Sequence, residues 1–166
     1  MAVKRILLIC PRFFQYYEFI CEEINKLGYE VDWYDDLPNK SNLTRAIGRV
    51  NPILIESIVR HYFDSMMEEI RARRYDIVLL LRSMSFSYTE DMLQEIKSTQ
   101  PGAEFVLYMW DALGNMHPYD WIWDFFDRCY SFEPKDIKTY SNIELLPLFY
   151  SDIFRSAALQ KEEPKY

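Results

Sequence analysis

Glycine, cysteine and histidine are scarce in this chain of 166 residues, which has four, three and two of them. The segment that follows the first apolar run, Cys10–Gln15, contains no glycine. Dinucleotide-binding turns and P-loops both need glycines at that position, so we expect neither site. The chain also lacks the G-x-S-x-G elbow that exposes a nucleophilic serine.

The three cysteines, Cys10, Cys21 and Cys129, are far apart and form no C-x-x-C pair. No set of histidine, cysteine and carboxylate residues has the spacing of a zinc site. We therefore expect the buried thiols of a reducing cytoplasm, no metal and no cofactor.

Long hydrophobic runs are absent as well. No apolar stretch approaches the ~20 residues that a membrane-spanning helix requires, and Met1–Arg5 leads into a short apolar strand rather than a signal peptide. The net charge of −7 repels nucleic acid and acidic membrane surfaces. These features predict a cytoplasmic protein that neither spans a membrane nor binds nucleic acid.

Aromatic residues are in excess: 13 Tyr, 11 Phe and 4 Trp make up 17% of the chain. A domain of this size buries only part of so many rings. We expect some of them to line a groove or to face a partner domain or a sugar. The alternative is an aromatic-rich core.

Short apolar runs alternate with segments of helical spacing. The runs at Ile6–Ile9 and Ile77–Leu81 have no polar face, as in strands buried on both sides of a parallel sheet. Further strands are expected at 29–34, 104–110, 128–132 and 143–146. Helices are expected at 14–27, 43–49, 52–73, 87–98, 118–126 and 134–140.

This alternation predicts an α/β fold: a three-layer Rossmann-like domain with helices on both faces of a parallel sheet. Right-handed crossovers give the strand order 2-1-3-4-5, with the sixth strand beyond the fifth. Residues 1–157 would form the single domain, and residues 158–166 a polar tail or an interdomain linker.

Ligands of open α/β sheets bind beyond the carboxyl ends of the central strands, where the strand order reverses. In the predicted order this edge carries Arg12 after the first strand and Arg82 after the third, with Ser83 and Ser85 nearby. Two guanidinium groups suit a phosphate or a carboxylate. The alternative is that each arginine pairs with a surface carboxylate of this acidic chain.

Asp111 follows the fourth strand at the same edge and is the candidate general base. The alternative for Asp111 is a loop or N-cap carboxylate. His117, in the next loop, is a candidate binding residue that could shuttle protons. A phospho-acceptor receiver site is excluded, because Cys10 and Arg82 stand where it needs acidic residues.

Three segments, Lys4–Phe14, Phe105–Asp111 and Tyr130–Asp136, together with Leu146–Tyr150, resemble the N-terminal half of bacterial CgeB-like glycosyltransferases, also described as lipopolysaccharide-biosynthesis proteins. The resemblance covers most of the chain. It implies one of the two Rossmann-like domains of the GT-B architecture. In that architecture the N-terminal domain mostly receives the acceptor, and a C-terminal domain makes most nucleotide-sugar contacts.

The chain stops near where such a second domain would begin, so the resemblance implies a domain that is incomplete for catalysis alone. The predicted function is the acceptor-side half of a glycosyltransferase of cell-surface polysaccharide synthesis, acting on lipopolysaccharide or capsule with a nucleotide-sugar donor. Its partners would be a C-terminal donor-binding domain and a sugar or glycan acceptor. Asp32, Asp35 and Asp36 do not form the Asp-x-Asp motif that holds a divalent cation in one class of glycosyltransferases, so transfer would be metal-independent. The alternative is a non-catalytic flavodoxin-like binding or protein-interaction module.

Overall fold

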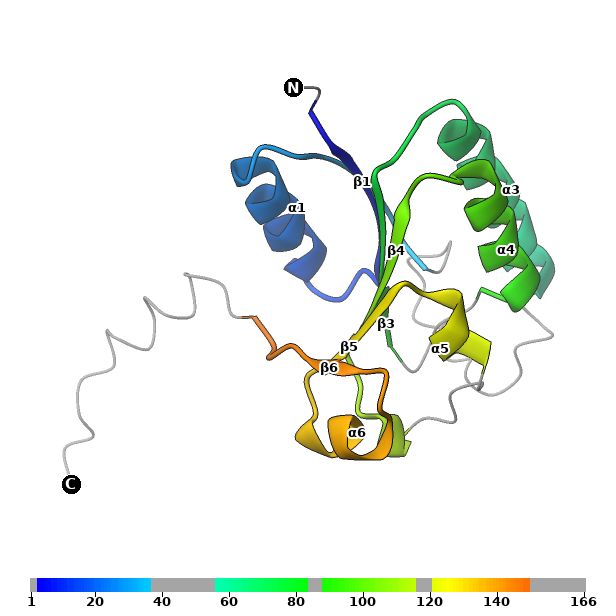
Figure 1. Cartoon of the computed structure of the whole chain (residues 1–166). Coiled ribbons are helices and arrows are strands. Elements are labelled where there is room, and N and C mark those ends of the chain that lie inside the picture. Colours follow the sequence, from blue (N-terminus) through cyan, green and yellow to red (C-terminus); the bar gives the residue numbers. More distant parts are fainter. Residues whose placement is uncertain (1–2, 37–55, 84–87, 116–120, 150–166) are drawn as a thin grey trace.

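A computed structural model describes residues 3–36, 56–83, 88–115 and 121–149 (Figure 1). The strands in these residues are β1 (Arg5–Ile9), β2 (Glu30–Tyr34), β3 (Ile77–Arg82), β4 (Glu104–Met109), β5 (Arg128–Ser131) and β6 (Glu144–Leu145). The helices are α1 (Tyr16–Lys26), α3 (Glu56–Arg71), α4 (Glu90–Thr99), α5 (Trp121–Phe125) and α6 (Pro134–Thr139), with a 3-10 turn, η2 (Leu113–Asn115).

All six strands belong to one parallel sheet in the order β2-β1-β3-β4-β5-β6. The predicted strand order is confirmed, including the sixth strand beyond the fifth. β1 lies beside β3, with Ile6 opposite Ile77 and Ile9 opposite Leu80. The residues that follow these two strands therefore reach the same edge of the sheet.

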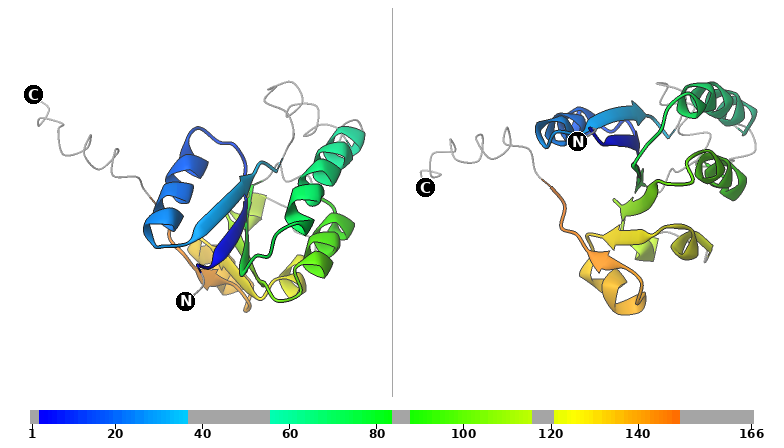
Figure 2. Two further views of the ribbon diagram at one scale, coloured as in Figure 1. Left: turned by 90° about the horizontal axis from the view of Figure 1, so that it is seen from above. Right: turned by 45° about the horizontal axis from the view of Figure 1, so that its top comes forward.

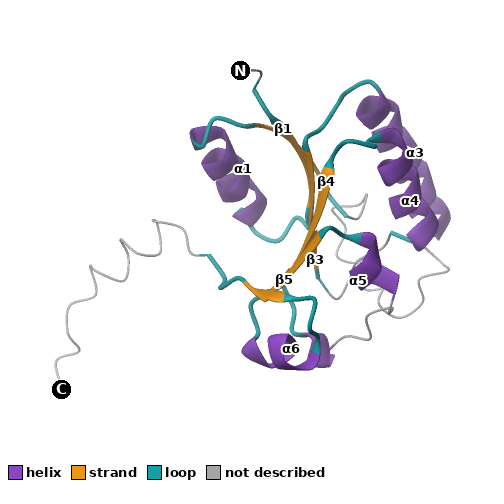
Figure 3. Cartoon of the chain, in the orientation of Figure 1, coloured by secondary structure: helices purple, strands orange, loops and turns teal. Residues whose placement is uncertain are grey.

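Helices lie on both faces of this sheet. α1 covers one face, and α3, α4 and α5 cover the other, while α6 lies next to β5 and β6 (Figures 1, 2 and 3). The predicted three-layer α/β fold, Rossmann-like or flavodoxin-like, is therefore confirmed. Among the helices described, none combines the length and the hydrophobicity that a bilayer crossing requires.

Local sequence explains where two of the helices begin and end. α1 ends before Gly28, whose φ of +86° lies in the left-handed region that favours glycine. α4 begins after Thr89, whose hydroxyl accepts a hydrogen bond from the Met92 N–H at 3.4 Å. The predicted start of this helix at residue 87 is therefore three residues too early. The expected helix at 43–49 and the start of the helix at 52–73 lie outside the described residues.

The two faces of the sheet are buried to different extents. Val78, Leu80, Phe105 and Leu107 point toward α3, α4 and α5, because alternate residues of a strand point to the same face. In the part of the chain that the structure describes, 24 hydrophobic residues are buried on that side. The buried residues on the α1 side number six: Ile6, Leu8, Cys10, Ile24, Leu81 and Tyr108. The α1 side is therefore the thinner layer.

Candidate functional site

Arg12 leaves the carboxyl end of β1 and is held by neighbours from the same domain. Its guanidinium carbon lies 4.8 Å from the centre of the Trp33 ring and 5.4 Å from that of Tyr17. Its Nε lies 3.8 Å from Oδ2 of Asp35, and its backbone N–H donates to Oδ1 of the same carboxylate at 3.2 Å. The pairing of Arg12 with a carboxylate, which was the alternative to anion binding, is therefore present.

Arg82 is the last residue of β3 and is buried, with 8% of its surface exposed. The strand alternation places it on the same face as Val78 and Leu80, toward α3 and α4. Arg12, in contrast, packs on Trp33, which belongs to the α1 side. The structure thus brings the two arginines to one edge of the sheet but directs their side chains to opposite faces. A single anion held by both remains a prediction.

The carboxylate of Asp36, the second residue after β2, is fully buried at this edge. The neighbouring Asp35 accepts a hydrogen bond at its carbonyl oxygen from the Tyr88 hydroxyl at 3.1 Å. Burial, followed by the negative charge of Asp35, raises the pKa of Tyr62 to about 12. Arg82 and Asp36 each make further polar contacts. In the sequence, Asp35 and Asp36 were considered only as part of an absent Asp-x-Asp motif, and the burial of Asp36 was not predicted; the available signal is a pair of acidic residues at the end of a strand.

Of the four remaining predicted site residues, the structure describes two. Ser83 and Asp111 follow β3 and β4 at the carboxyl edge, are half-buried, and both interact with neighbours. The role of Asp111 as a general base stays a prediction. Ser85 and His117 lie outside the described residues.

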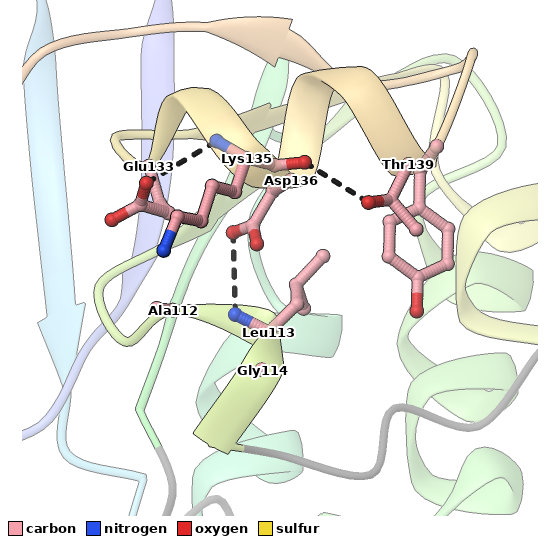
Figure 4. A pocket seen from close by; sticks show the side chains of 8 residues that line it. Ala112, Leu113, Gly114, Glu133, Lys135, Asp136 and Thr139 are labelled. Atoms are coloured by element: carbon pink, nitrogen blue, oxygen red, sulfur yellow. Dashed lines mark hydrogen bonds between the residues drawn. The ribbon is translucent and has the colours of Figure 1, made fainter.

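A pocket of about 410 Å³ opens between η2 and α6 (Figure 4). Its central side chain, Asp136, is buried and accepts hydrogen bonds from the Ser131 hydroxyl at 2.6 Å and from the Leu113 N–H at 3.2 Å. Glu133 and Lys135 lie at its rim (Figure 4). The Asp136 carboxylate therefore joins the segment after β4 to α6, which is a structural role.

Five aromatic residues form a continuous surface at the carboxyl edge, which we call the aromatic surface: Phe13, Phe14, Tyr16, Trp110 and Phe149. The Tyr16 ring contacts the other four, with centroid distances from 5.8 to 6.4 Å. Phe13 and Phe14 pack edge to face at 4.7 Å. Their surfaces are 52% and 78% exposed, and that of Phe149 is 39% exposed.

The backbone of Phe14 has a φ of +48°, an unusual value for a residue with a bulky side chain. The Phe14 side chain is exposed, and its ring lies beside that of Phe13. Strained residues of this kind cluster at functional sites. The aromatic content of the sequence predicted rings outside the core, but no sequence pattern joined residues 13–16 to residue 149.

Comparisons with known proteins give a likeness of fold. No family model matches this chain, and no curated protein matches it. One matching structure is a phosphorylated response regulator from Burkholderia pseudomallei, with 11% identity and a TM-score of 0.41. The match covers 66% of this chain, which spans about half (48%) of that protein.

Two further structures match over most of the chain. One is a complex of the histidine kinase ThkA with the response regulator TrrA: 18% identity, 82% of this chain, 94% of the matched chain and a TM-score of 0.48. The other is a putative pilus assembly-related protein from Burkholderia pseudomallei K96243: 11% identity, 96% of this chain, 93% of that one and a TM-score of 0.37. The likeness is limited to the arrangement of strands and helices.

The predicted membership of the CgeB-like glycosyltransferases is wrong. No family model of that kind matches, and the matching structures are described as response-regulator or pilus-assembly proteins rather than GT-B enzymes. Three predictions that depended on this membership are therefore wrong as well: the lipopolysaccharide or capsule function, the sugar acceptor and the C-terminal donor-binding domain. The three main segments that carried the resemblance contain β1, most of β4 and the end of β5, each with the residues that follow the strand, and many α/β domains share segments of this kind.

Proposed function

We propose that this domain is a non-catalytic protein-interaction module and that it binds its partner through the aromatic surface. The observation that carries the proposal is the pair Phe13 and Phe14, adjacent rings that are 52% and 78% exposed on a loop of unusual backbone conformation. Contiguous exposed apolar surface marks interaction sites, and phenylalanine is enriched in protein interfaces.

The shape of this surface favours a protein partner over a small molecule. Phe13 and Phe14 project from the loop, whereas small ligands bind in concave sites that enclose most of their surface. The complementary partner is a folded protein that offers an apolar pocket for the two rings.

Two features of the carboxyl edge support a non-catalytic role. Burial raises the pKa of the Cys10 thiol well above its ordinary range, so Cys10 is not available as a thiolate nucleophile. The guanidinium of Arg12 is already engaged by Asp35 and by the Trp33 ring.

A cytoplasmic location belongs to the same proposal. Its support is that Cys10, Cys21 and Cys129 all remain free thiols, as is usual in a reducing compartment.

The test compares three forms of the full chain in affinity purification from the native cells. In Phe14→Asn the ring is lost, and asparagine tolerates a positive φ. The control is Leu27→Asn, because Leu27 is 74% exposed at the other end of α1. We expect a protein that is retained by wild type and Leu27→Asn and lost with Phe14→Asn, and that binds again when both proteins are purified. Retention of the same proteins by all three forms would contradict the proposal.

A further inference from the structure

One oxygen of a buried carboxylate faces the pocket between η2 and α6. Asp136 is 4% exposed, and both of its hydrogen bonds, from the Ser131 hydroxyl and the Leu113 N–H, go to Oδ2. Oδ1 accepts no hydrogen bond from the described residues, yet it is not one of the side-chain atoms that are buried without a partner. Oδ1 is therefore open to the pocket that Asp136 lines (Figure 4).

This oxygen is suited to a positively charged donor. Each carboxylate oxygen has two lone pairs, and those of Oδ1 are available to a ligand. The surrounding protein screens charge less than water does, so the ammonium group of a ligand would form a strong, charge-assisted hydrogen bond at this position.

The size and position of the pocket suit a small molecule. Its volume of about 410 Å³ lies within the range of small-ligand sites. The segments that build it, 112–114 and 133–140, follow β4 and β5. The pocket therefore lies at the carboxyl edge of the sheet, where ligands of α/β domains bind.

Two charged side chains lie at the rim of the pocket, and they differ in what they offer. The Glu133 carboxylate caps α6, because it accepts a hydrogen bond from the Lys135 N–H at 3.2 Å. The side chain of Lys135 is exposed and lines the pocket, so its ammonium group suits a carboxylate on the ligand. Ala112, Leu113 and Tyr140 contribute apolar surface to the walls.

We propose that this pocket binds a free α-amino acid with an apolar side chain. The ammonium group of the ligand donates to Oδ1 of Asp136, and its carboxylate pairs with the ammonium group of Lys135. An α-amino acid carries both groups on one carbon, which matches two protein groups on adjacent residues. Its side chain packs against Leu113 and Tyr140. A carboxylic acid without an amine would bring a like charge to Asp136.

This proposal goes beyond the interaction role and does not depend on it. The pocket is built by η2 and α6, whereas Phe13 and Phe14 belong to the loop after β1. No partner protein is needed to test it.

Two-dimensional NMR of the backbone amides of the full chain tests the proposal. The probes are alanine, valine, leucine, isoleucine, methionine and phenylalanine, each as the L-amino acid. We expect at least one to bind with a dissociation constant of about 1 mM or lower and to shift the amide signals of Leu113 and Lys135. The analogue of that amino acid without its amine should bind at least about tenfold more weakly.

Three variants locate the binding groups. Asp136→Asn keeps an oxygen that accepts from Ser131 and Leu113 but places an NH₂ group at the position of Oδ1. Lys135→Gln removes the charge at the rim. Both should weaken binding at least about tenfold. The control is Lys138→Gln, because Lys138 is exposed on the same helix and does not line the pocket.

Support requires binding to wild type and to Lys138→Gln that is weakened by both of the other variants. Absence of binding to wild type at about 10 mM of every probe overturns the proposal. It is also overturned if either pocket variant binds as tightly as the control, or if the analogue without an amine binds as tightly as the amino acid. That last comparison uses the wild-type chain, so it decides the role of Asp136 even if Asp136→Asn does not fold.

Discussion

The hydroxyl group of Tyr108, in the fourth strand, donates a hydrogen bond to the carbonyl oxygen of Leu146, 38 residues later in the chain. The same hydroxyl reaches the carbonyl oxygen of Pro147. These contacts attach the segment after β6 to the α1 side of the sheet, where Phe149 completes the aromatic surface.

Replacing Tyr108 with phenylalanine should loosen this segment without disturbing the sheet. We expect Tyr108→Phe to lower the free energy of unfolding by about 1 kcal/mol, the usual net contribution of such a hydrogen bond. Amides near Leu148 and Phe149 should exchange faster. Urea denaturation and hydrogen exchange measure the two effects. Tyr29→Phe, on the same side of the sheet, is the control, and an equal effect of both substitutions would contradict the assigned contact.

The position of Arg12 over Trp33 and beside Asp35 predicts a contribution to stability. We expect Arg12→Ala to lower the free energy of unfolding by about 1 kcal/mol, through loss of the cation–π contact and the ion pair. Arg12→Lys should restore only part of this, because the planar guanidinium stacks on a ring better than an ammonium group does. Urea denaturation of both variants provides the measurement, and full recovery with lysine would show that charge alone matters.

The fold was predictable because its signals are local. The apolar runs at Ile6–Ile9 and Ile77–Leu81 have no polar face, and the segments between strands have helical spacing. The strand order and the α/β fold class therefore follow from general rules of parallel sheets. The predicted neighbours β1 and β3 are neighbours in the structure.

The proposed anion site was less predictable, for a physical reason. Strand alternation fixes the face on which Arg82 lies, but Arg12 lies three residues beyond the end of β1, where that alternation no longer applies. Its contact with Trp33 determines the face, and this contact joins residues 21 positions apart. The buried Asp36 and the surface formed by Tyr16 and Phe149 likewise depend on contacts between distant segments.

The raised pKa of Tyr62 predicts how stability depends on pH. The folded domain holds the phenol proton up to about pH 12, mainly because the Tyr62 side chain is partly buried, whereas the unfolded chain releases it near pH 10. The free energy of unfolding should therefore fall as the pH rises from 10 to 12. Tyr62→Phe should make this slope less steep, by at most about 1.4 kcal/mol per pH unit for one proton. Chemical denaturation at several pH values measures the slope, and an unchanged slope would contradict the prediction.

The buried carboxylate of Asp136 predicts a larger effect on stability. Asp136→Ala leaves the Ser131 hydroxyl and the Leu113 N–H without their acceptor. We expect a loss of about 2 kcal/mol in the free energy of unfolding, since buried donors without an acceptor are costly. Asp124→Ala, at an exposed position of α5, should change it by less than about 0.5 kcal/mol. Thermal or urea denaturation compares them, and similar losses would argue against the assigned role of Asp136.

The most direct test of the interaction role is the dissociation constant of the purified partner protein for the wild-type chain and for Phe14→Asn, with Leu27→Asn as the control. Removal of a central interface ring typically costs about 2 kcal/mol. We therefore predict a dissociation constant about 30-fold higher for Phe14→Asn and unchanged for Leu27→Asn. Equal dissociation constants for wild type and Phe14→Asn would contradict the account.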